Sequence, residues 1–454
     1  MKYYLGSLVC LCFGLSLASE DTYYRAAVVR GLKYDQDSLK DLPIIREAAD
    51  SKVDILVLPL PQGSSTSTFE SCCGVDNYDE LVRTLSEVSK AGHLYLVAHL
   101  LEKTWCQGKN ELVRSNLVFD RDGHIVSVYR KPVNDIANCT SSATGFGTFT
   151  TDFGVTFGVL MEEDLALLNS KDLKGLKNFV LTGSRTAEFP YLSASRFAAS
   201  WAFVNQAILI STSGVFAGQS GMKTGGTNLE IVKLNKSQDS AMVPPVVTAS
   251  APLPAEDLSL YAVVPLDLTA IANGHHETVC QDGFCCDFYL KAKVTGKVDE
   301  ANYSIAVTSG VCALFACGIQ HKRLCSLRSV HNNTNVVFEK ISVTGDFSMG
   351  STEYPIILTA NTSVKSEQFH FESLQTNTLK RVTLEVENVN NIFDFIIYGS
   401  DTEKSQFQSH ARTQIPSITP GYIISGDLDE FFDYVWIRVR IFIFVASIYV
   451  LEML

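Results

Sequence analysis

The amino-acid sequence predicts an α/β domain followed by a smaller all-β domain that disulfide bonds stabilise. Two observations lead to this prediction. Over roughly the first two hundred residues of the mature chain, short apolar runs alternate with segments whose apolar residues recur at helical spacing. After about residue 240, prolines interrupt the chain and short β-branched runs alternate with turns. We expect a sheet covered by helices in the first part and sheets alone in the second.

The first eighteen residues have the features of a secretory leader. Lys2 supplies a positive charge, an apolar stretch covers residues 4–15, and Ser16-Leu17-Ala18 is a small-residue cleavage site. The apolar stretch is too short to cross a bilayer comfortably. We therefore expect residues 1–18 to be removed and the mature chain to be exported.

The first domain is predicted over residues 19–268 and begins with βαβ units. Its expected elements alternate in the order strand 26–29, helix 39–49, strand 53–58, helix 81–88 and strand 94–98. Gly92 stands where the C-terminal cap of the second helix belongs. These units predict parallel strands with helices packed on the sheet.

The same domain continues with a hairpin and a further helix. Asp122-Gly123 supplies a tight turn within residues 119–125. Ser193 is a candidate N-cap for a helix that runs to Asn205 and carries Phe197 and Trp201 on one face, and a strand follows at residues 208–211.

The second domain is predicted over residues 269–426, and its cysteines are its main feature. Of the twelve cysteines of the chain, two lie in the leader, which leaves ten, an even number in an exported protein. Six of these ten fall in the second domain. Disulfide bonds are therefore expected, metal ligation is the less common alternative, and the pairing stays open. The disulfide candidates are Cys72, Cys73, Cys106, Cys139, Cys280, Cys285, Cys286, Cys312, Cys317 and Cys325.

Five N-x-[ST] sequons agree with export and predict a glycoprotein. They begin at Asn138, Asn235, Asn302, Asn332 and Asn361. The final segment, residues 427–454, is a hydrophobic tail, and Ser425-Gly426-Asp427 with the apolar run 441–451 resembles a glycolipid-anchor signal. A retained amphipathic tail and a plain hydrophobic C-terminus are the alternatives.

The charge of the chain limits its partners. A net charge of −12 without a basic cluster argues against nucleic-acid binding, because nothing would neutralise the phosphates. Membrane attachment is expected only through the C-terminal tail. No motif in the sequence predicts a cofactor. His275-His276-Glu277 is a weak metal candidate, because adjacent histidines cannot easily share one ion.

Two segments resemble the vanin/biotinidase (pantetheinase-like) branch of the nitrilase, or carbon-nitrogen hydrolase, superfamily. Residues 157–164, FGVLMEED, are similar to the segment that carries the nucleophilic cysteine in that family. The spacing of Cys280, Cys285 and Cys286, and then of Cys312, Cys317 and Cys325, is similar to the second domain of that branch. The resemblance implies a nitrilase-like α-β-β-α sandwich followed by the disulfide-bonded β domain. Because such sandwiches often pair through a helical face, it also allows a homo-oligomer.

The resemblance implies a catalytic set of glutamate, lysine and cysteine, and this chain keeps only the lysine. The thiolate attacks the amide carbonyl, the glutamate transfers protons and the lysine stabilises the oxyanion. Leu60 stands at the glutamate position, Lys131 at the lysine position and Glu162 at the cysteine position. No cysteine occurs in residues 155–170, so a small shift in the alignment does not restore the nucleophile.

The acidic run at residues 162–164 has several interpretations. Glu162 attacking an amide would form a high-energy anhydride, with no base at Leu60 to assist it. A buried pair between Lys131 and Glu162 is one structural hypothesis. Carboxylates in the first turn of a helix also interact well with its dipole, and a metal site is a further alternative without a nearby histidine.

We therefore expect a secreted or cell-surface pseudoenzyme of the vanin type that acts by binding an unidentified small-molecule or protein ligand. The alternative is an amidohydrolase of the pantetheinase or biotinidase type with non-standard catalytic groups. The missing cysteine and glutamate favour the first function, and the retained Lys131 keeps the second open.

Overall fold

The structure is a computed structural model of the 454-residue chain. It describes residues 22–29, 43–59, 69–72, 75–106, 109–133, 146–168, 171–183, 194–217, 221–223, 229–236, 243–248, 253–295, 302–317, 319–321, 324–327, 336–360 and 363–400. The predicted leader, Leu60 and the tail 427–454 lie outside these ranges.

The first domain contains a six-stranded sheet whose central strands are parallel. In order across the sheet, the strands are β14 (Leu229–Asn235), β1 (Tyr23–Val29), β2 (Ile55–Val57), β5 (Tyr95–Cys106), β6 (Lys109–Phe119) and β7 (Ile125–Pro132). Strands β1, β2 and β5 are parallel, and helices α1 (Pro43–Asp50) and α2 (Glu80–Gly92) connect them. The predicted βαβ units are thus confirmed, as is the hairpin that joins β6 to β7.

A second six-stranded sheet repeats this plan. Its strands, in order, are β13 (Gly221–Lys223), β12 (Gly214–Ala217), β11 (Ile208–Ser211), β10 (Asn178–Thr182), β9 (Thr156–Met161) and β8 (Gly147–Thr150). Strands β9, β10 and β11 are parallel at its centre. Helix α3 (Asp164–Leu167) follows β9, and helix α4 (Ala194–Val204) connects β10 to β11.

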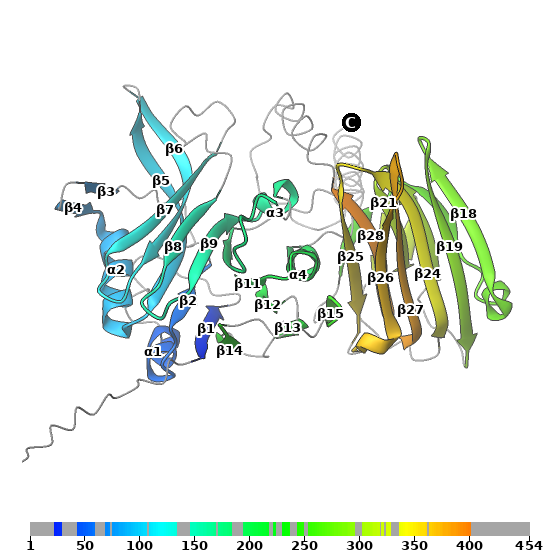
Figure 1. Cartoon of the computed structure of the whole chain (residues 1–454), viewed down its shortest axis with the longest axis horizontal. Coiled ribbons are helices and arrows are strands. Elements are labelled where there is room, and N and C mark those ends of the chain that lie inside the picture. Colours follow the sequence, from blue (N-terminus) through cyan, green and yellow to red (C-terminus); the bar gives the residue numbers. More distant parts are fainter. Residues whose placement is uncertain are drawn as a thin grey trace, which may run out of the picture. The chain divides into compact units, whose positions relative to one another are not determined.

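The two sheets pack face to face between helices, which makes an α-β-β-α sandwich (Figure 1). An aromatic cluster fills the space between the sheets, where Phe157 contacts Tyr24 and Phe149 at ring distances of 5.7 and 5.3 Å. A separate apolar core lies under α1 and α2. Helix α4 covers the second sheet, and its Trp201 packs edge-on against Phe179 of β10 at 5.3 Å.

The end of helix α2 differs from the prediction. Gly92 is the last helical residue, and the left-handed cap conformation is taken by His93, with φ of 48°. A Cβ atom on Gly92 would lie 3.1 Å from the Leu94 side chain and 3.7 Å from Ala49 of α1. Gly92 is therefore not the cap, and a side chain there would crowd Leu94, which follows the helix.

The second domain is built from two further sheets. The third sheet of the chain contains β15 (Val246–Thr248), β25 (Thr352–Thr359), β28 (Ile392–Ser400), β21 (Val311–Cys317), β20 (Asn302–Thr308) and β17 (Ala262–Pro265). The fourth contains β18 (His275–Gln281), β19 (Phe284–Val294), β24 (Val336–Ser348), β27 (Leu379–Asn390) and β26 (Phe369–Gln375). An apolar core between them includes Tyr303 of β20 and Phe338 of β24, whose rings lie 5.0 Å apart.

Smaller elements complete the described chain. They are the three-stranded sheet of β16 (Leu253–Asp257), β23 (Leu324–Leu327) and β22 (Ile319–His321), the hairpin of β3 (Phe69–Cys72) and β4 (Val75–Tyr78), and the short 3-10 helices η2 (Ala270–Asn273) and η3 (Ser366–Gln368).

Disulfide bonds hold the fourth sheet. Cys280 is joined to Cys285 between β18 and β19, and Cys286 is joined to Cys312 across the two sheets. Gly345 of β24 packs over the second bond, because a Cβ atom there would lie 2.8 Å from the Cys312 sulfur. The side chains of the other six disulfide candidates lie outside the described residues.

Helix α4 packs against both domains. One side contacts β11 and β12 of the second sheet, and another contacts β15 and β25 of the third sheet. The ring of Phe197 lies 4.9 Å from Tyr354 and 5.6 Å from Tyr398. In addition, Ser400 Oγ at the end of β28 donates a 2.8 Å hydrogen bond to the carbonyl of Ala166 in α3. The apolar core is consequently continuous from the second sheet into the β domain.

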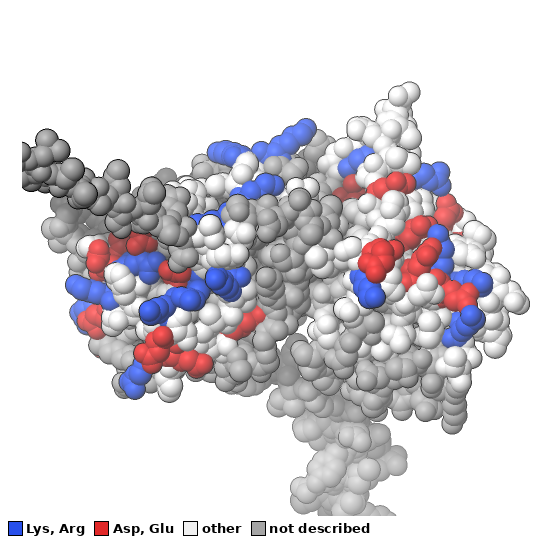
Figure 2. Space-filling model, turned by 60° about the horizontal axis from the view of Figure 1, so that its bottom comes forward, with Lys and Arg blue, Asp and Glu red and all other residues white. Residues whose placement is uncertain are grey.

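The described surface carries charges of both signs, and these are interleaved in the view of Figure 2. Among the described residues, no helix is long and apolar enough to cross a membrane. Of the five sequon asparagines, Asn235 is half-buried at the end of β14 and Asn302 begins β20, whereas the other three lie outside the described ranges. Glycosylation therefore remains a prediction.

Candidate functional site at the corner between β9 and α3

Glu162 lies at the sharp corner where a buried strand meets a short helix. All but the first residue of β9 are buried because the strand sits inside the second sheet between β8 and β10. The strand ends at Met161, and α3 begins at Asp164. Glu162 and Asp164 each expose only 4% of their surface. The chain thus places two carboxylates in a buried position directly after a central strand.

Asp164 holds this corner together. One of its oxygens, Oδ2, accepts a 2.7 Å hydrogen bond from the backbone amide of Met161. The hydroxyl of Tyr129 donates to both carboxylate oxygens at 3.1 Å. The ammonium group of Lys131 forms an ion pair with Oδ1. Burial raises the pKa of Asp164 above its ordinary value, and the nearby Lys131 ammonium opposes that rise.

Lys131 reaches the corner from β7 in the opposite sheet. Tyr129 and Lys131 are two residues apart in this strand, so their side chains leave the same face of the sheet. The Lys131 ammonium also lies 3.8 Å from Glu163 Oε1. Lys131 thus pairs with Asp164 and Glu163, the two carboxylates that follow Glu162, and a pair with Glu162 itself stays a prediction. The bond to the Met161 amide fixes the Asp164 carboxylate, and that carboxylate contacts Lys131.

A second cation, Arg114, borders the site. Its guanidinium nitrogen Nη2 lies 2.7 Å from Glu163 Oε1 and donates at 3.2 Å to the carbonyl of Pro132. The Arg114 and Glu163 side chains are 36% and 31% exposed, so this pair lies at the rim. Of the described residues, Lys131 and Arg114 approach the corner, and both form ion pairs with carboxylates of the run 162–164.

A buried polar cluster lies behind the corner and joins the two sheets. Asn116 of β6 donates a 3.1 Å hydrogen bond to the carbonyl of Leu160 in β9. Its carbonyl oxygen accepts from the Thr182 hydroxyl of β10 and lies 2.6 Å from His99 Nδ1 of β5. Because that oxygen only accepts, the proton is assigned to Nδ1 of His99. Burial lowers the pKa of His99, so the ring is neutral at pH 7.

Sequence reasoning missed this cluster. The available signal was a polar residue inside an apolar run: His99 is the one such residue in the segment 94–101, and Asn116 directly precedes the apolar run 117–119. Such residues need a hydrogen-bond partner when buried, but the sequence does not say which strands supply it.

Another buried carboxylate, Glu102, is held in a bidentate pair. Arg130 donates to its two oxygens at 2.6 and 2.9 Å, and Ser115 donates at 2.5 Å. Arg130 precedes Lys131, so its side chain leaves the other face of β7. Glu102 is therefore held as a structural anchor rather than as a base beside the corner.

Possible metal ligands occur elsewhere in the described chain. Asp120, Asp122 and His124 gather at the hairpin between β6 and β7. Asp120 Oδ1 accepts from the backbone amides of Asp122 and His124 at 3.0 and 2.9 Å, which explains the grouping as turn geometry. In the weak histidine motif, His275 Nε2 lies 3.1 Å from Glu277 Oε2.

Comparison with known proteins agrees with this architecture. Residues 252–405 match the family described as the vanin C-terminal domain. The chain is 25% identical over 440 residues to vanin-like protein 3 of Drosophila melanogaster, covering 78% of this chain and 83% of that protein. It is 26% identical over 404 residues to vanin-like protein 1 of the same organism, covering 68% and 72%.

Solved structures of nitrilase-superfamily proteins are also similar to part of the chain. A Saccharomyces cerevisiae protein of branch 10 of that superfamily is 18% identical, covers 47% of this chain and 90% of its own, and has a TM-score of 0.37. An amidase from Nesterenkonia sp. is 13% identical, covers 47% and 90%, and has a TM-score of 0.33.

Proposed function

We propose that this vanin-like protein, whose first domain has the carbon-nitrogen hydrolase fold, is a pseudoenzyme that acts by binding. The observation that carries the proposal is the ion pair of Lys131 with Asp164 at the corner occupied by Glu162. In the amide-cleaving members of the superfamily, the corresponding lysine stabilises the oxyanion. A lysine that two carboxylates already neutralise attracts a developing anion weakly.

Glu162 is a poor replacement for a thiolate at an amide. Its carboxylate would have to form an anhydride, and the position of the proton-transferring glutamate holds Leu60, which carries no titratable group. In a well-studied serine protease, loss of the nucleophile alone lowers turnover by about a millionfold. His99 is neutral, but its Nδ1 is held by Asn116, and Glu102 is held by Arg130. Neither side chain supports the role of a substitute base.

The proposal places the protein outside the cell. The leader predicted at residues 1–18, the five sequons and the disulfide bonds Cys280–Cys285 and Cys286–Cys312 support secretion or attachment to the cell surface. The ligand is proposed to be a small amide or a protein surface that reaches the β9–α3 corner, where the rim pair Arg114–Glu163 is exposed.

The test is hydrolysis of a fluorogenic pantetheine amide and of a biotinyl amide by the purified, glycosylated protein. A Glu162→Cys, Leu60→Glu double variant is measured beside it, together with a thiol-directed amide probe. We expect a silent wild type, and a double variant that is labelled by the probe.

The controls separate the outcomes. Wild-type turnover that Lys131→Ala abolishes would overturn the proposal and favour the alternative, an amidohydrolase of the pantetheinase or biotinidase type with non-standard groups. Titration calorimetry of the wild type with the uncleaved amides tests the binding function. Failure of both amides to bind would exclude them as ligands and turn the search to protein partners.

A further inference from the structure

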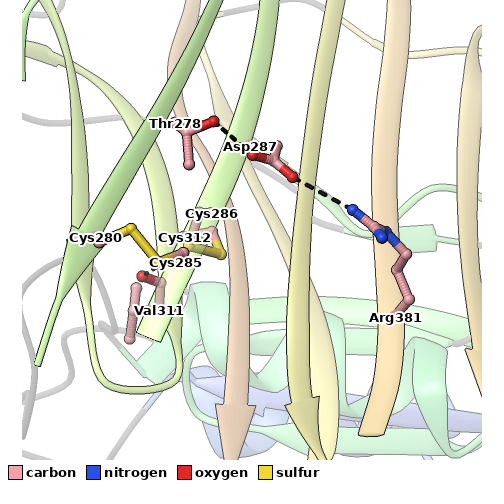
Figure 3. Close-up of a disulfide and its surroundings, with 8 residues drawn as sticks. All are labelled: Thr278, Cys280, Cys285, Cys286, Asp287, Val311, Cys312 and Arg381. Atoms are coloured by element: carbon pink, nitrogen blue, oxygen red, sulfur yellow. Dashed lines mark hydrogen bonds and ion pairs between the residues drawn. A yellow bond between two sulfur atoms is a disulfide. The ribbon is translucent and has the colours of Figure 1, made fainter. Parts of the chain in front are cut away.

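The two disulfide bonds of the fourth sheet are adjacent in sequence but opposite in burial. Cys285 and Cys286 are consecutive residues of β19, so their side chains leave opposite faces of the sheet. Cys286 and Cys312 are fully buried at 0% exposure. Cys280 and Cys285 are both exposed. Figure 3 shows the two bonds, one within the β18–β19 hairpin and the other leading from β19 to Cys312 of β21.

The outer bond lies where a solvent thiol can reach it. Cys280 and Cys285 are directly opposite each other in the β18–β19 ladder, next to the turn at Asp282 and Gly283. Among the described strands, β18 lies at the edge of its sheet and pairs with β19. Attack on a disulfide requires a straight approach to one sulfur, and an exposed bond at a sheet edge permits it.

The hairpin has other contacts that would survive opening of the outer bond. The hydroxyl of Thr278 donates at 2.7 Å to Asp287, and Arg381 of β27 donates to the same carboxylate at 3.3 Å (Figure 3). The rings of His276 and Tyr289 lie 4.6 Å apart across the same two strands. The two sulfurs would therefore stay opposite each other after reduction, which favours re-formation of the bond.

The inner bond, in contrast, is buried between the two sheets of the β domain. It joins β19 of the fourth sheet to β21 of the third, and Gly345 packs against the Cys312 sulfur. A thiol can reach it only if the two sheets separate. The two bonds thus differ in access because side chains alternate along β19, which turns Cys285 toward solvent and Cys286 toward the core.

We propose that Cys280–Cys285 is a thiol–disulfide exchange site for low-molecular-weight thiols, and that Cys286–Cys312 does not exchange in the folded protein. A thiolate attacks one sulfur of the outer bond, forms a mixed disulfide with it and releases the other cysteine as a thiolate. A second small thiol then attacks the mixed disulfide. The two small thiols leave as their own disulfide, and the protein keeps two thiols. The inference does not depend on whether the protein cleaves amides.

The test treats the folded, glycosylated protein with graded reduced glutathione, quenches it with an alkylating reagent and maps each cysteine by peptide mass spectrometry. We expect Cys280 and Cys285 to be labelled at least about tenfold faster than Cys286 and Cys312. Equal labelling of the four cysteines, or slower labelling of the outer pair, would overturn the proposal.

A matched variant separates exchange from unfolding. In Cys280→Ser, Cys285→Ser protein, we expect Cys286 and Cys312 to stay as unreactive as in the wild type at the same glutathione concentration. Labelling of the inner pair in this variant would mean that the outer bond protects the core, which contradicts independent exchange. Circular dichroism of the wild type after reduction checks that labelling occurs in the folded state.

Discussion

The ammonium group of Lys131 lies against the carboxylate of Asp164, the residue two positions beyond Glu162. The pair joins β7 of the first sheet to α3, which directly follows β9 of the second sheet, so it bridges the two halves of the sandwich. Tyr129 and the Met161 amide bind the same carboxylate. The site that the resemblance associates with catalysis is thus held by a structural hydrogen-bond network.

Replacing Asp164 should destabilise the first domain. Asp164→Asn leaves Lys131 with Glu163 as a more distant partner, and we expect a loss of about 2 kcal/mol in the free energy of unfolding. Urea denaturation measures it. Asp122→Asn, at an exposed turn position, is the control and should change stability by less than about 0.5 kcal/mol. Equal effects of the two variants would show that the network contributes little.

Stability should fall on acidification because of His99. Burial lowers the pKa of His99 in the folded protein below its ordinary value of 6.5. Between these two values the unfolded chain binds the proton more strongly, so unfolding takes up a proton and the folded state loses stability as pH falls. Arg114 lowers this pKa further, whereas Asn116 and Glu163 oppose the shift.

The measurement is the urea midpoint as a function of pH, compared with that of His99→Gln. The variant cannot take up this proton, so its midpoint should depend less on pH below about pH 6.5. His124→Gln, which replaces a histidine whose side chain is 67% exposed, is measured beside it as the matched control. Parallel curves for the wild type and His99→Gln would contradict the assignment.

Phe197 should be essential for the stability of both domains. Its ring is fully buried between Tyr354 and Tyr398, and we expect Phe197→Ala to cost about 4 kcal/mol. Tyr23→Ala, at a 41% exposed position, is the control and should cost far less. Calorimetry of the wild type should give one transition, and Phe197→Ala should separate it into two. Two transitions already in the wild type would mean that the domains unfold independently.

A side chain at Gly345 should lower the free energy of unfolding while the inner disulfide is present. A Cβ atom would lie 2.8 Å from the Cys312 sulfur and 3.0 Å from the Phe347 ring, so Gly345→Ala should cost about 2 kcal/mol. Gly350→Ala is the control, since nothing lies within 4 Å of the added atom. In a Cys286→Ala, Cys312→Ala background the cost should be smaller, and an unchanged cost would assign the clash to Phe347 alone.

The charge of Asp287 should slow exchange at the outer disulfide. Asp287 lies two residues after Cys285 on the same face of β19, so it repels an anionic thiol such as glutathione. Asp287→Asn should increase the rate with glutathione by about threefold and the rate with dithiothreitol by less, because the attacking dithiothreitol thiolate carries a smaller negative charge. A similar increase with both thiols would indicate loosening of the hairpin through the lost bond to Thr278.

The sequence predicted the secondary structure correctly where hydrophobic periodicity and turn residues determine it. The alternation of strands and helices led to β1, α1, β2, α2 and β5, and the Asp-Gly turn located the β6–β7 hairpin. At the end of α2 the local rule was wrong by one residue, because His93 takes the left-handed cap conformation although it is not a glycine.

The composition of the site was less predictable than the fold. Lys131 and the run 162–164 could be selected by resemblance, but their pairing depends on which carboxylate the Met161 amide holds. The cluster of His99, Asn116 and Thr182 unites strands of two different sheets, with partners up to 83 positions apart. Side-chain partners at such separations follow from the packing of the sheets and not from local periodicity.

Helix α4 belongs to both domains at once, and this limits how the protein can be divided. A chain limited to residues 252–405 would expose Tyr354 and Tyr398, which Phe197 now covers, and would lack β15 at the edge of its larger sheet. Such a fragment would need a substitute cover for its apolar face in order to remain monomeric. The β domain is therefore not a portable module, and a fragment that keeps its core covered has to include α4.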